Sequence, residues 1–315
     1  MDPLRAFLDG PRASDAFLLR ALLAPPWSLR IQDEAPLAVV ALTGGTAAIR
    51  FDDGEEAVLG AGDVAIVRGP DHYLVAHDLA TPVQVVIHPG ERCTTPDGVE
   101  IGGDMDLGVR TWGNSPHGST VMLVGAYQSD GEVSRRMLDA LPRLIVVRAG
   151  SSESPAVALL SAEIVRDDPG QEVVLDRLLD LVLVATLRAA FAEPGAAVPD
   201  WYRAQGDPVV GPAVQRLLDD PAEPWTVATL AASVGVSRAG LARRFHDLVG
   251  QPPMAFLTGW RMALAADLLL EPGATVGGVS RQVGYGSPFT FSTAFKRTYG
   301  ASPRAHRDQA LIRVG

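Results

Sequence analysis

The side chains with the clearest chemical potential lie near the end of the chain, in the segment GYGSPFTFSTAFKRTYGASP that spans residues 284–303. Ser287 followed by Pro288 is typical of a helix start, because a serine hydroxyl caps the first free N–H groups and proline suits the first helical position. Three side chains then recur at helical spacing, so we expect one buried face. That face would consist of Phe291, Phe295 and Thr298.

The opposite face of the same helix carries a different set of side chains. Phe289 falls almost opposite the buried face when each residue turns the helix by about 100°. Its neighbours on that side are Ser292, Thr293 and Lys296, the only lysine of the chain. A helix face that meets only water normally mixes charges of both signs, whereas this set has no acidic member. The face therefore fits a groove lined by phosphates.

The same pattern occurs about fifty residues earlier. Each copy reads as a short helix, a glycine-containing turn, a serine N-cap and a second helix, which is the pattern of a helix-turn-helix motif. The matched pairs are Ser237 with Ser287, Leu241 with Phe291, Phe245 with Phe295, and Gly250 with Gly300. In the first copy the inner face is Leu241, Phe245 and Leu248, and the outer face is Ala239, Ala242, Arg243 and His246. A long helix predicted over Met254–Leu270 joins the copies, and two copies in tandem are far more specific than one.

Charge is divided unevenly between these helices and the rest of the chain. The 315 residues carry a formal net charge of −10, which alone would argue against nucleic acid. Residues 1–199 hold 15 Lys and Arg against 28 Asp and Glu, whereas residues 200–315 hold 12 against 9. Such an asymmetry is expected when a basic, DNA-binding surface is attached to an acidic module.

The first half of the chain is predicted to be an antiparallel β-sandwich or barrel. Short β-rich runs alternate with Gly- and Pro-containing turns, and no helix separates them, as a parallel sheet would require. The expected strands are Leu37–Leu42, Thr46–Phe51, Ala57–Leu59, Val64–Val67, Tyr73–Ala76, Val83–His88 and Val121–Tyr127.

Helices are expected after Glu132, over Val133–Ala140, Pro155–Arg166 and Gln171–Phe191. The last of these carries Leu and Val on more than one face, so several of its sides must be buried. We expect the β domain to cover one side and a second subunit to cover another. The stretch AEPGAAVPDWYRAQGDP, residues 192–208, is rich in Pro, Gly and Ala and is predicted to join two domains.

The C-terminal third, from about Pro208 to Arg307, resembles the paired helix-turn-helix module of the AraC/XylS family of transcription regulators. LAASVGVSRAGLARRF, WRMALAADLL and VGYGSPFTFSTAFKRTYGASP carry the resemblance. It implies seven helices, with two recognition helices in successive major grooves on one face of double-stranded DNA. It implies base-facing positions at Arg238, Ala239, Ala242, Arg243, Pro288, Phe289, Ser292 and Thr293. It implies phosphate contacts from Ser237, Ser287, Lys296 and Arg297, the serines through helix N-termini.

Two positions of the second recognition helix depart from the family pattern. Many members carry arginine where this chain has Thr293, and a polar residue where it has Phe289. We therefore expect this helix to contact thymine methyl groups, since it has fewer hydrogen bonds to offer. Arg243 in the first helix becomes the strongest single candidate for direct base readout.

The β-rich half resembles a cupin. Gly62 and Asp63 before a strand, followed by Pro70 and His72, are similar to the second half of the cupin pattern. The stretch VRTWGNSPHGSTVMLVGAYQ resembles N-terminal domains fused to this helix-turn-helix module. Metal-bearing cupins supply a His-x-His pair and a carboxylate from an earlier strand, but VVALTGGTAAIRFDDG, the corresponding stretch, has no histidine. We therefore expect no metal, no cofactor and no catalysis.

Three interpretations of the β domain remain open. As a sensor, it would bind an unknown small-molecule effector in the mouth of the sandwich or barrel. The candidate ligand-binding residues are His72, Tyr73, Trp112 and Tyr127. As a cupin-type metalloenzyme with a helical protein-interaction domain, its candidate metal ligands would be His72, His77, His88 and Cys93. Cys93 beside Arg92 is also a candidate redox-sensitive thiol, although a lone cysteine has no partner in its own chain.

The sequence thus predicts an α+β, multidomain protein. Residues 1–130 would form the cupin-like β domain, 131–195 a helical dimerisation and linker segment, and 208–311 an all-α DNA-binding domain with two tandem helix-turn-helix motifs. We expect a sequence-specific transcription regulator, and an activator because activation is the commoner mode of the family. Its expected partners are double-stranded DNA, a small-molecule effector, a second copy of the chain and RNA polymerase.

The sequence also predicts a cytoplasmic protein without a membrane partner. The longest apolar stretch, Val173–Phe191, is interrupted by four charged residues, so we do not expect it to span a membrane. The N-terminus lacks the basic and apolar regions of a secretory signal. A single cysteine fits a reducing compartment.

Overall fold

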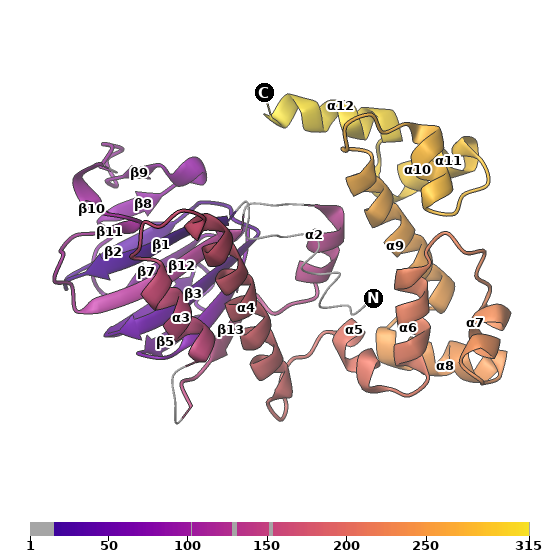
Figure 1. Ribbon diagram of the computed structural model, residues 1–315, viewed down its shortest axis with the longest axis horizontal. Helices are drawn as coiled ribbons and strands as arrows, with labels where there is room; N and C mark the ends of the chain where they lie inside the picture. Colours follow the sequence, from indigo (N-terminus) through magenta and orange to yellow (C-terminus); the bar gives the residue numbers. More distant parts are fainter. Residues whose placement is uncertain (1–15, 102, 128–130, 151–153, 315) are drawn as a thin grey trace. The chain divides into compact units, whose positions relative to one another are not determined.

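The computed structural model describes residues 16–101, 103–127, 131–150 and 154–314. The chain divides into two compact units. One combines Leu141–Ala197 with the described part of Pro11–Ser129, and the other combines the described parts of Val198–Gly315 and Asp130–Ala140. The first is rich in strands and the second is helical (Figure 1).

The first unit is a sandwich of two sheets (Figure 1). One sheet has the strand order β10-β11-β1-β12-β3-β6-β13 and the other β5-β4-β7-β2-β8-β9. Neighbouring strands are antiparallel except for β1 with β11 and β2 with β8. The strands are β1 Ala16–Leu23, β2 Ser28–Ile31, β3 Leu37–Gly44, β4 Thr46–Phe51, β5 Glu56–Gly60, β6 Val64–Arg68, β7 Tyr73–Ala76, β8 Val85–Ile87, β9 Cys93–Thr94, β10 Asp106–Gly108, β11 Thr111–Gly113, β12 Thr120–Tyr127 and β13 Leu144–Val147.

The larger sheet is covered on both faces, which explains the apolar runs in its central strands. Residues 37–42 of β3 are all buried, so this strand does not alternate between apolar and polar side chains. On the outer face, helix α4 (Gln171–Ala192) lies against β12. Gly125 of β12 leaves room there for Leu179 of α4, because a β carbon at that position would collide with the leucine.

The stretch 131–195, expected as one helical segment, is divided in the structure. Helix α2 (Glu132–Leu138) belongs to the second unit, whereas α3 (Pro155–Glu163) and α4 belong to the first. Between them, β13 pairs with β6 at the edge of the larger sheet. β13 was not predicted, because its four residues become a strand only through pairing with a strand distant in the sequence. The strands β1, β2, β9, β10 and β11 were missed as well, whereas those expected from Leu37 to His88 and at Val121–Tyr127 are present with small shifts in their ends.

The second unit contains the helices that the AraC/XylS resemblance implied. After the short α5 (Asp200–Arg203), its helices are α6 Val210–Asp219, α7 Val227–Ser233, α8 Arg238–Val249, α9 Pro253–Leu268, α10 Val276–Gln282, α11 Pro288–Tyr299 and α12 Pro303–Val314. α7–α8 and α10–α11 form two helix-turn-helix motifs, and α9 joins them. Each motif has its own core: Trp260 of α9 packs in the first, and Met262 and Ala266 pack in the second. Within the described ranges, no helix is long and apolar enough to cross a membrane.

Candidate nucleic-acid interface and ligand cavity

Both recognition helices begin with a serine cap, as the sequence predicted for both copies. The Ser237 hydroxyl accepts a hydrogen bond from the Gly240 N–H at 3.1 Å, and the Ser287 hydroxyl accepts one from the Thr290 N–H at 3.2 Å. Both helices end at a glycine with positive φ, Gly250 at 75° and Gly300 at 73°. These stops favour glycine because other residues rarely adopt this conformation.

The inner faces of the two helices are buried, with one difference from the prediction. Phe245 and Phe295 are both 0% exposed, and so are their partners one turn earlier, Leu241 and Phe291. Thr298 is exposed, so its assignment to the inner face was wrong. Tyr299 takes that place, with its ring centroid 4.7 Å from that of Phe295. The inward-facing residue is thus the eighth after Phe291 rather than the seventh, as Val249 is the eighth after Leu241 in the first motif; Val249 is buried and Tyr299 is partly buried.

The outer face of α8 presents two free guanidinium groups. Arg238 and Arg243 are exposed, and neither makes an ion pair or hydrogen bond with a described residue. Arg244 differs, because its Nε donates a hydrogen bond to Asp207 Oδ2 at 2.8 Å and its Nη2 lies 2.7 Å from the same oxygen. Asp207 also accepts from two N–H groups at the start of α6, so Arg244 fastens α8 to α6. Burial opposes ionisation of Asp207, but hydrogen bonds from Arg244 and the backbone keep its pKa below the ordinary value.

The outer face of α11 presents a ring, two hydroxyl groups and two cations. Phe289 is 83% exposed. The Ser292 hydroxyl donates to the carbonyl of Pro288 at 2.7 Å, and the Thr293 hydroxyl donates to that of Phe289 at 3.1 Å. Their protons are therefore already used within the helix. A shallow hollow of about 420 Å³ is lined by Phe289, Ser292, Thr293, Lys296, Arg297 and Ser302.

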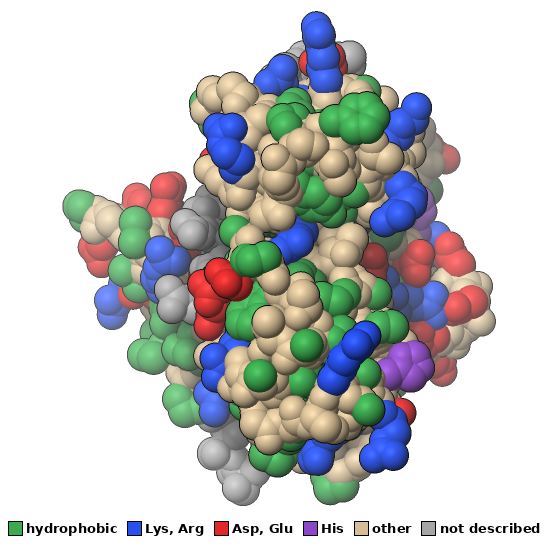
Figure 2. Space-filling view, turned by 90° about the vertical axis from the view of Figure 1, so that its right-hand side faces the viewer, with side chains coloured by type: hydrophobic (Ala, Val, Ile, Leu, Met, Phe, Trp, Pro, Cys, Tyr) green, Lys and Arg blue, Asp and Glu red, His purple; other side chains and the backbone are tan. Residues whose placement is uncertain are grey.

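Figure 2 shows one face of the helical unit nearest the viewer. Lys and Arg side chains stand around its upper and lower parts, with exposed hydrophobic side chains among them and few acidic ones. Cations together with apolar groups suit a surface that contacts phosphates and base edges.

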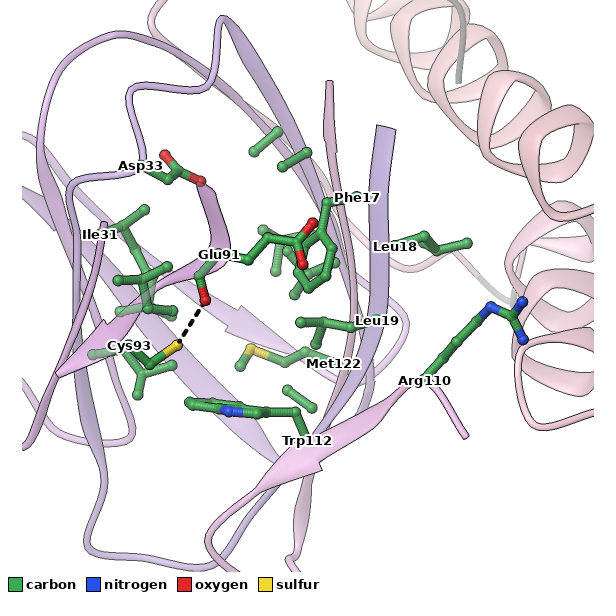
Figure 3. A pocket seen from close by; sticks show the side chains of 18 of the residues that line it. Phe17, Leu18, Leu19, Ile31, Asp33, Glu91, Cys93, Arg110, Trp112 and Met122 are labelled. Carbon is green, nitrogen blue, oxygen red and sulfur yellow. Dashed lines mark hydrogen bonds between the residues drawn. The ribbon is translucent and has the colours of Figure 1, made fainter. Parts of the chain in front are cut away.

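The sandwich encloses a cavity of about 570 Å³ between its two sheets. Leu29, Ile31 and Val75 line it from one sheet, and Val40 and Met122 line it from the other. Trp112 of β11 lies flat across one end, below the Met122 sulfur (Figure 3). A largely apolar cavity of this size is typical of a small-molecule site.

The cavity lining also includes polar side chains. They include Asp33, His88, Glu91, Cys93 and Asp106. Burial raises the pKa of Asp33. Arg110 also borders the cavity but points away from it, and its Nη1 donates to Gln171 Oε1 of α4 at 2.7 Å (Figure 3).

Cys93 does not have the surroundings of a reactive thiolate. Its Sγ lies 3.6 Å from the carbonyl oxygen of Glu91 (Figure 3). Burial raises the pKa of the thiol, and the Glu91 charge raises it further. The expected influence of Arg92 is absent, because that side chain turns toward Glu100 at 3.7 Å.

The four sequence candidates for ligand binding are only partly brought together. Tyr73 and Trp112 line the cavity, whereas His72 and Tyr127 are not among its lining residues. The Tyr127 hydroxyl instead donates to Asp180 of α4 at 3.4 Å. Sequence reasoning missed the wall formed by Leu19 and Ala21, since it did not predict β1. The run AFLLRALL, apolar except for Arg20, was the available signal.

Two of the four metal-ligand candidates, His77 and His88, make hydrogen-bond contacts with neighbouring groups. His77 Nδ1 lies 3.2 Å from the backbone nitrogen of Trp27 and 3.1 Å from its carbonyl oxygen. His88 Nε2 lies 2.9 Å from the Thr94 hydroxyl. In the part of the chain that the structure describes, no three His, Cys, Asp or Glu side chains are grouped so that they could hold a metal ion.

Comparison with known proteins decides the family. A family model described as Cupin matches residues 2–192, and one described as Helix-turn-helix domain matches residues 230–309. An AraC-like transcription regulator of Streptomyces lividans is 31% identical over 314 residues, which cover 98% of each chain. The chain belongs to the AraC-like transcription regulators. An AraC-like transcription regulator of Streptomyces antibioticus is 29% identical over 317 residues. The alignment covers 99% of the present chain and 100% of the Streptomyces antibioticus protein.

A solved structure matches about a third of the regulator. The DNA-binding domain of AdpA in complex with a target DNA is 33% identical, and the alignment covers 34% of this chain and 96% of that one, with a TM-score of 0.33. The family matches confirm the predicted cupin-like N-terminal domain and the AraC-type helix-turn-helix domain that follows it.

Proposed function

We propose that this regulator places α8 and α11 in successive major grooves of double-stranded DNA, under the control of a small molecule in the sandwich cavity. One observation carries the DNA part. The two helices repeat the same cap and core, and their outward sets expose Arg243 and the 83% exposed Phe289 without any carboxylate among them.

In this arrangement α8 reads bases and α11 mainly anchors. The free guanidinium of Arg243 can donate two hydrogen bonds to O6 and N7 of a guanine, with Arg238, Ala239 and Ala242 beside it. On α11, Phe289 would meet thymine methyl groups, flanked by Pro288, Ser292 and Thr293. Lys296 and Arg297 would contact phosphates, as would the capped N-termini at Ser237 and Ser287.

Titration of labelled DNA with the full-length protein at two salt concentrations tests this function. We expect a duplex selected by the protein from a random library to bind about a thousandfold more tightly than an unrelated duplex. Affinity should also fall as salt rises. Equal affinity for both duplexes at both salt concentrations would contradict sequence-specific binding.

The cavity supports a ligand that is mainly apolar and carries a hydrogen-bond donor. Its walls are mainly aliphatic and Trp112 offers a flat ring, whereas its polar groups include three carboxyl groups, those of Asp33, Glu91 and Asp106. The Arg110 guanidinium is turned away, so a ligand carboxylate would meet no cation there. We therefore propose an alcohol or an amine with an apolar body as the effector class.

Thermal unfolding in the presence of matched probes tests this ligand class. We expect medium-chain alcohols and amines to raise the unfolding temperature and the carboxylates of equal length to leave it unchanged. Leu19→Trp, which narrows the cavity, should abolish the rise, and Val58→Trp at the exposed 60% position of β5 should preserve it. Stabilisation by carboxylates alone would contradict the proposed class.

We also propose that two copies pair through α4. An exposed apolar stripe runs along one side of this helix, with Val173 62%, Val174 45% and Leu181 48% exposed. In an antiparallel pair, this stripe would be buried against the same stripe of the second copy, as a two-fold interface requires. Light scattering should show a dimer for the wild type and a monomer for Leu181→Glu, with Val58→Glu as the control. A wild-type monomer would contradict the pairing.

The remaining parts of the proposal concern the cell. We propose a cytoplasmic activator that recruits RNA polymerase and performs no catalysis itself. A reporter behind the selected DNA site should rise in the presence of the regulator and its effector. A fall in the same assay would make the protein a repressor.

A further inference from the structure

Helix α2 belongs to the second, helical unit, although it comes from the middle of the chain. This unit contains both helix-turn-helix motifs and is called the DNA-binding unit below. α2 lies between β12 and β13 in the sequence, yet it packs against α9, the helix that joins the two helix-turn-helix motifs. β12 contributes Met122, Val124 and Ala126 to the cavity lining. The chain therefore runs from the cavity wall into the DNA-binding unit and back to the sheet edge.

The start of α2 is held by a carboxylate of α9. Asp267 Oδ1 accepts from the Glu132 N–H at 2.6 Å, and Asp267 Oδ2 accepts from the Val133 N–H at 3.1 Å. The first N–H groups of a helix have no partner within the helix, so an acceptor at this place acts as a cap. This cap comes from a residue 135 positions away in the chain.

The body of α2 is fastened to the first motif. Val133 is 9% exposed and belongs to the same core as Leu230 and Trp260. The Arg136 guanidinium lies over the ring of Phe256, 5.6 Å from its centroid. Gly259 of α9 makes room for it, because a β carbon there would collide with the guanidinium.

The start of α2 also lies near the second motif. Asp267 lies next to Ala265 and Ala266 of α9, which pack in the second core. Burial raises the pKa of the Tyr299 hydroxyl in α11, and the neighbouring carboxylates of Glu132 and Asp267 raise it further. The short helix thus has contacts or close neighbours in both halves of the DNA-binding unit.

We propose that α2 is an intramolecular brace, which holds α8 and α11 at the separation needed for two successive major grooves. Two linked binding modules gain most when their separation matches the two sites, and they lose this gain when the linkage loosens. The inference rests on the proposed use of both helices on DNA.

The test uses the full-length protein and two duplexes. One is the duplex selected by the wild type, and the other has one half-site replaced by unrelated sequence. For Asp267→Ala, we expect the ratio of the two affinities to fall about tenfold, while affinity for the single half-site changes less than about twofold. Hydrogen exchange should show lost protection at residues 132–138. Asp267→Asn, which keeps an acceptor oxygen, should restore part of the ratio.

Glu271→Ala serves as the matched control, since Glu271 is an exposed carboxylate just past the end of α9. It should change neither the ratio nor the exchange. An unchanged ratio in Asp267→Ala with unprotected α2 amides would overturn the brace, and so would an equal loss on both duplexes. If Asp267→Ala does not fold, Arg136→Ala takes its place with the same criteria. A wild type that binds both duplexes equally would overturn the two-groove function and the brace together.

Discussion

The two helix-turn-helix motifs share a plan but offer DNA different chemistry. The first motif exposes the guanidinium groups of Arg238 and Arg243, which pair with no described residue. At matching positions the second motif has Pro288 and Thr293, and the Thr293 hydroxyl donates to its own helix. A duplicated scaffold has thus been given one helix that can donate hydrogen bonds to bases and one that meets DNA through a ring and cations.

The motifs also differ in what supports them. The first core includes α6, part of α9 and Val133 of α2. The second is built around a row of rings, Tyr285, Phe291, Phe295 and Tyr299, with neighbouring centroids 4.7 to 5.7 Å apart. The outer surfaces can therefore diverge, because each motif keeps an independent apolar core.

The largest expected effect is on the free energy of unfolding, when a buried ring is removed from one core at a time. Phe245→Ala and Phe295→Ala should each cost about 3–5 kcal/mol in the free energy of unfolding, because each removes a fully buried ring. Hydrogen exchange should place the loss of protection for Phe295→Ala in α10 and α11, with α7 and α8 still protected. Equal loss in both motifs would show one shared core instead of two. The exposed Phe289→Ala is the control and should cost less than about 0.5 kcal/mol.

The next effect separates the two reading helices. Arg243→Ala should cost about 1–3 kcal/mol in binding to the selected duplex and relax the base preference at one position. Thr293→Ala, at the matching place of α11, should cost less than about 0.5 kcal/mol, since its hydroxyl proton is used within the helix. Competition with a set of single-base variants measures both. If Arg243→Ala weakened binding to every duplex equally, Arg243 would be a phosphate contact.

A smaller effect tests the ring of α11. Phe289→Ala should cost about 0.8 kcal/mol in binding for each thymine methyl group that it no longer covers. Replacing the contacted thymine by uracil, which lacks the methyl, should cost the wild type a similar amount and cost Phe289→Ala nothing. If the two losses were independent and additive in this double-mutant cycle, the Phe289 ring would not contact the thymine methyl group.

The smallest expected effect on base preference comes from removing Lys296, the anchoring cation of α11. Lys296→Ala should weaken binding to all duplexes alike and lower the slope of log affinity against log salt by about 1. Isothermal titrations at several salt concentrations measure the slope. His246→Ala, at the matching place of α8, should leave the slope at neutral pH nearly unchanged. A base-dependent loss for Lys296→Ala would contradict a purely phosphate role.

Much of the helical unit could be predicted because its signals are local. The serine caps, glycine stops and spacing of Phe291 and Phe295 all lie within a few turns of each helix. Thr298 was misplaced because the buried stripe drifts around a helix of 3.6 residues per turn, and the ring of Tyr299 reaches both Phe295 and His306. The contact of Tyr299 with His306 of α12 favours Tyr299 over Thr298 as the inward-facing residue, and this contact cannot be read from the sequence of α11 alone.

Less of the sandwich and its cavity could be predicted because their signals are distant. β1 pairs with β12, about a hundred residues later, and β13 is a strand only through β6. Trp112 was found because an aromatic residue beside a glycine stands out, whereas Leu19 and Met122 look like any core residue until both sheets are placed. Asp267 gave no local sign that it caps α2.

The division of labour between the two motifs is tested most directly by complete base substitution of the selected site. Each base pair is changed to the three others, and the affinity of the full-length wild type is measured for every duplex at one salt concentration. We predict two sensitive regions centred one helical turn apart. The region relaxed by Arg243→Ala should lose about 1–3 kcal/mol per substitution, and the other should tolerate all changes except those at thymines. Equal sensitivity in both regions, with guanine contacts in each, would contradict the account.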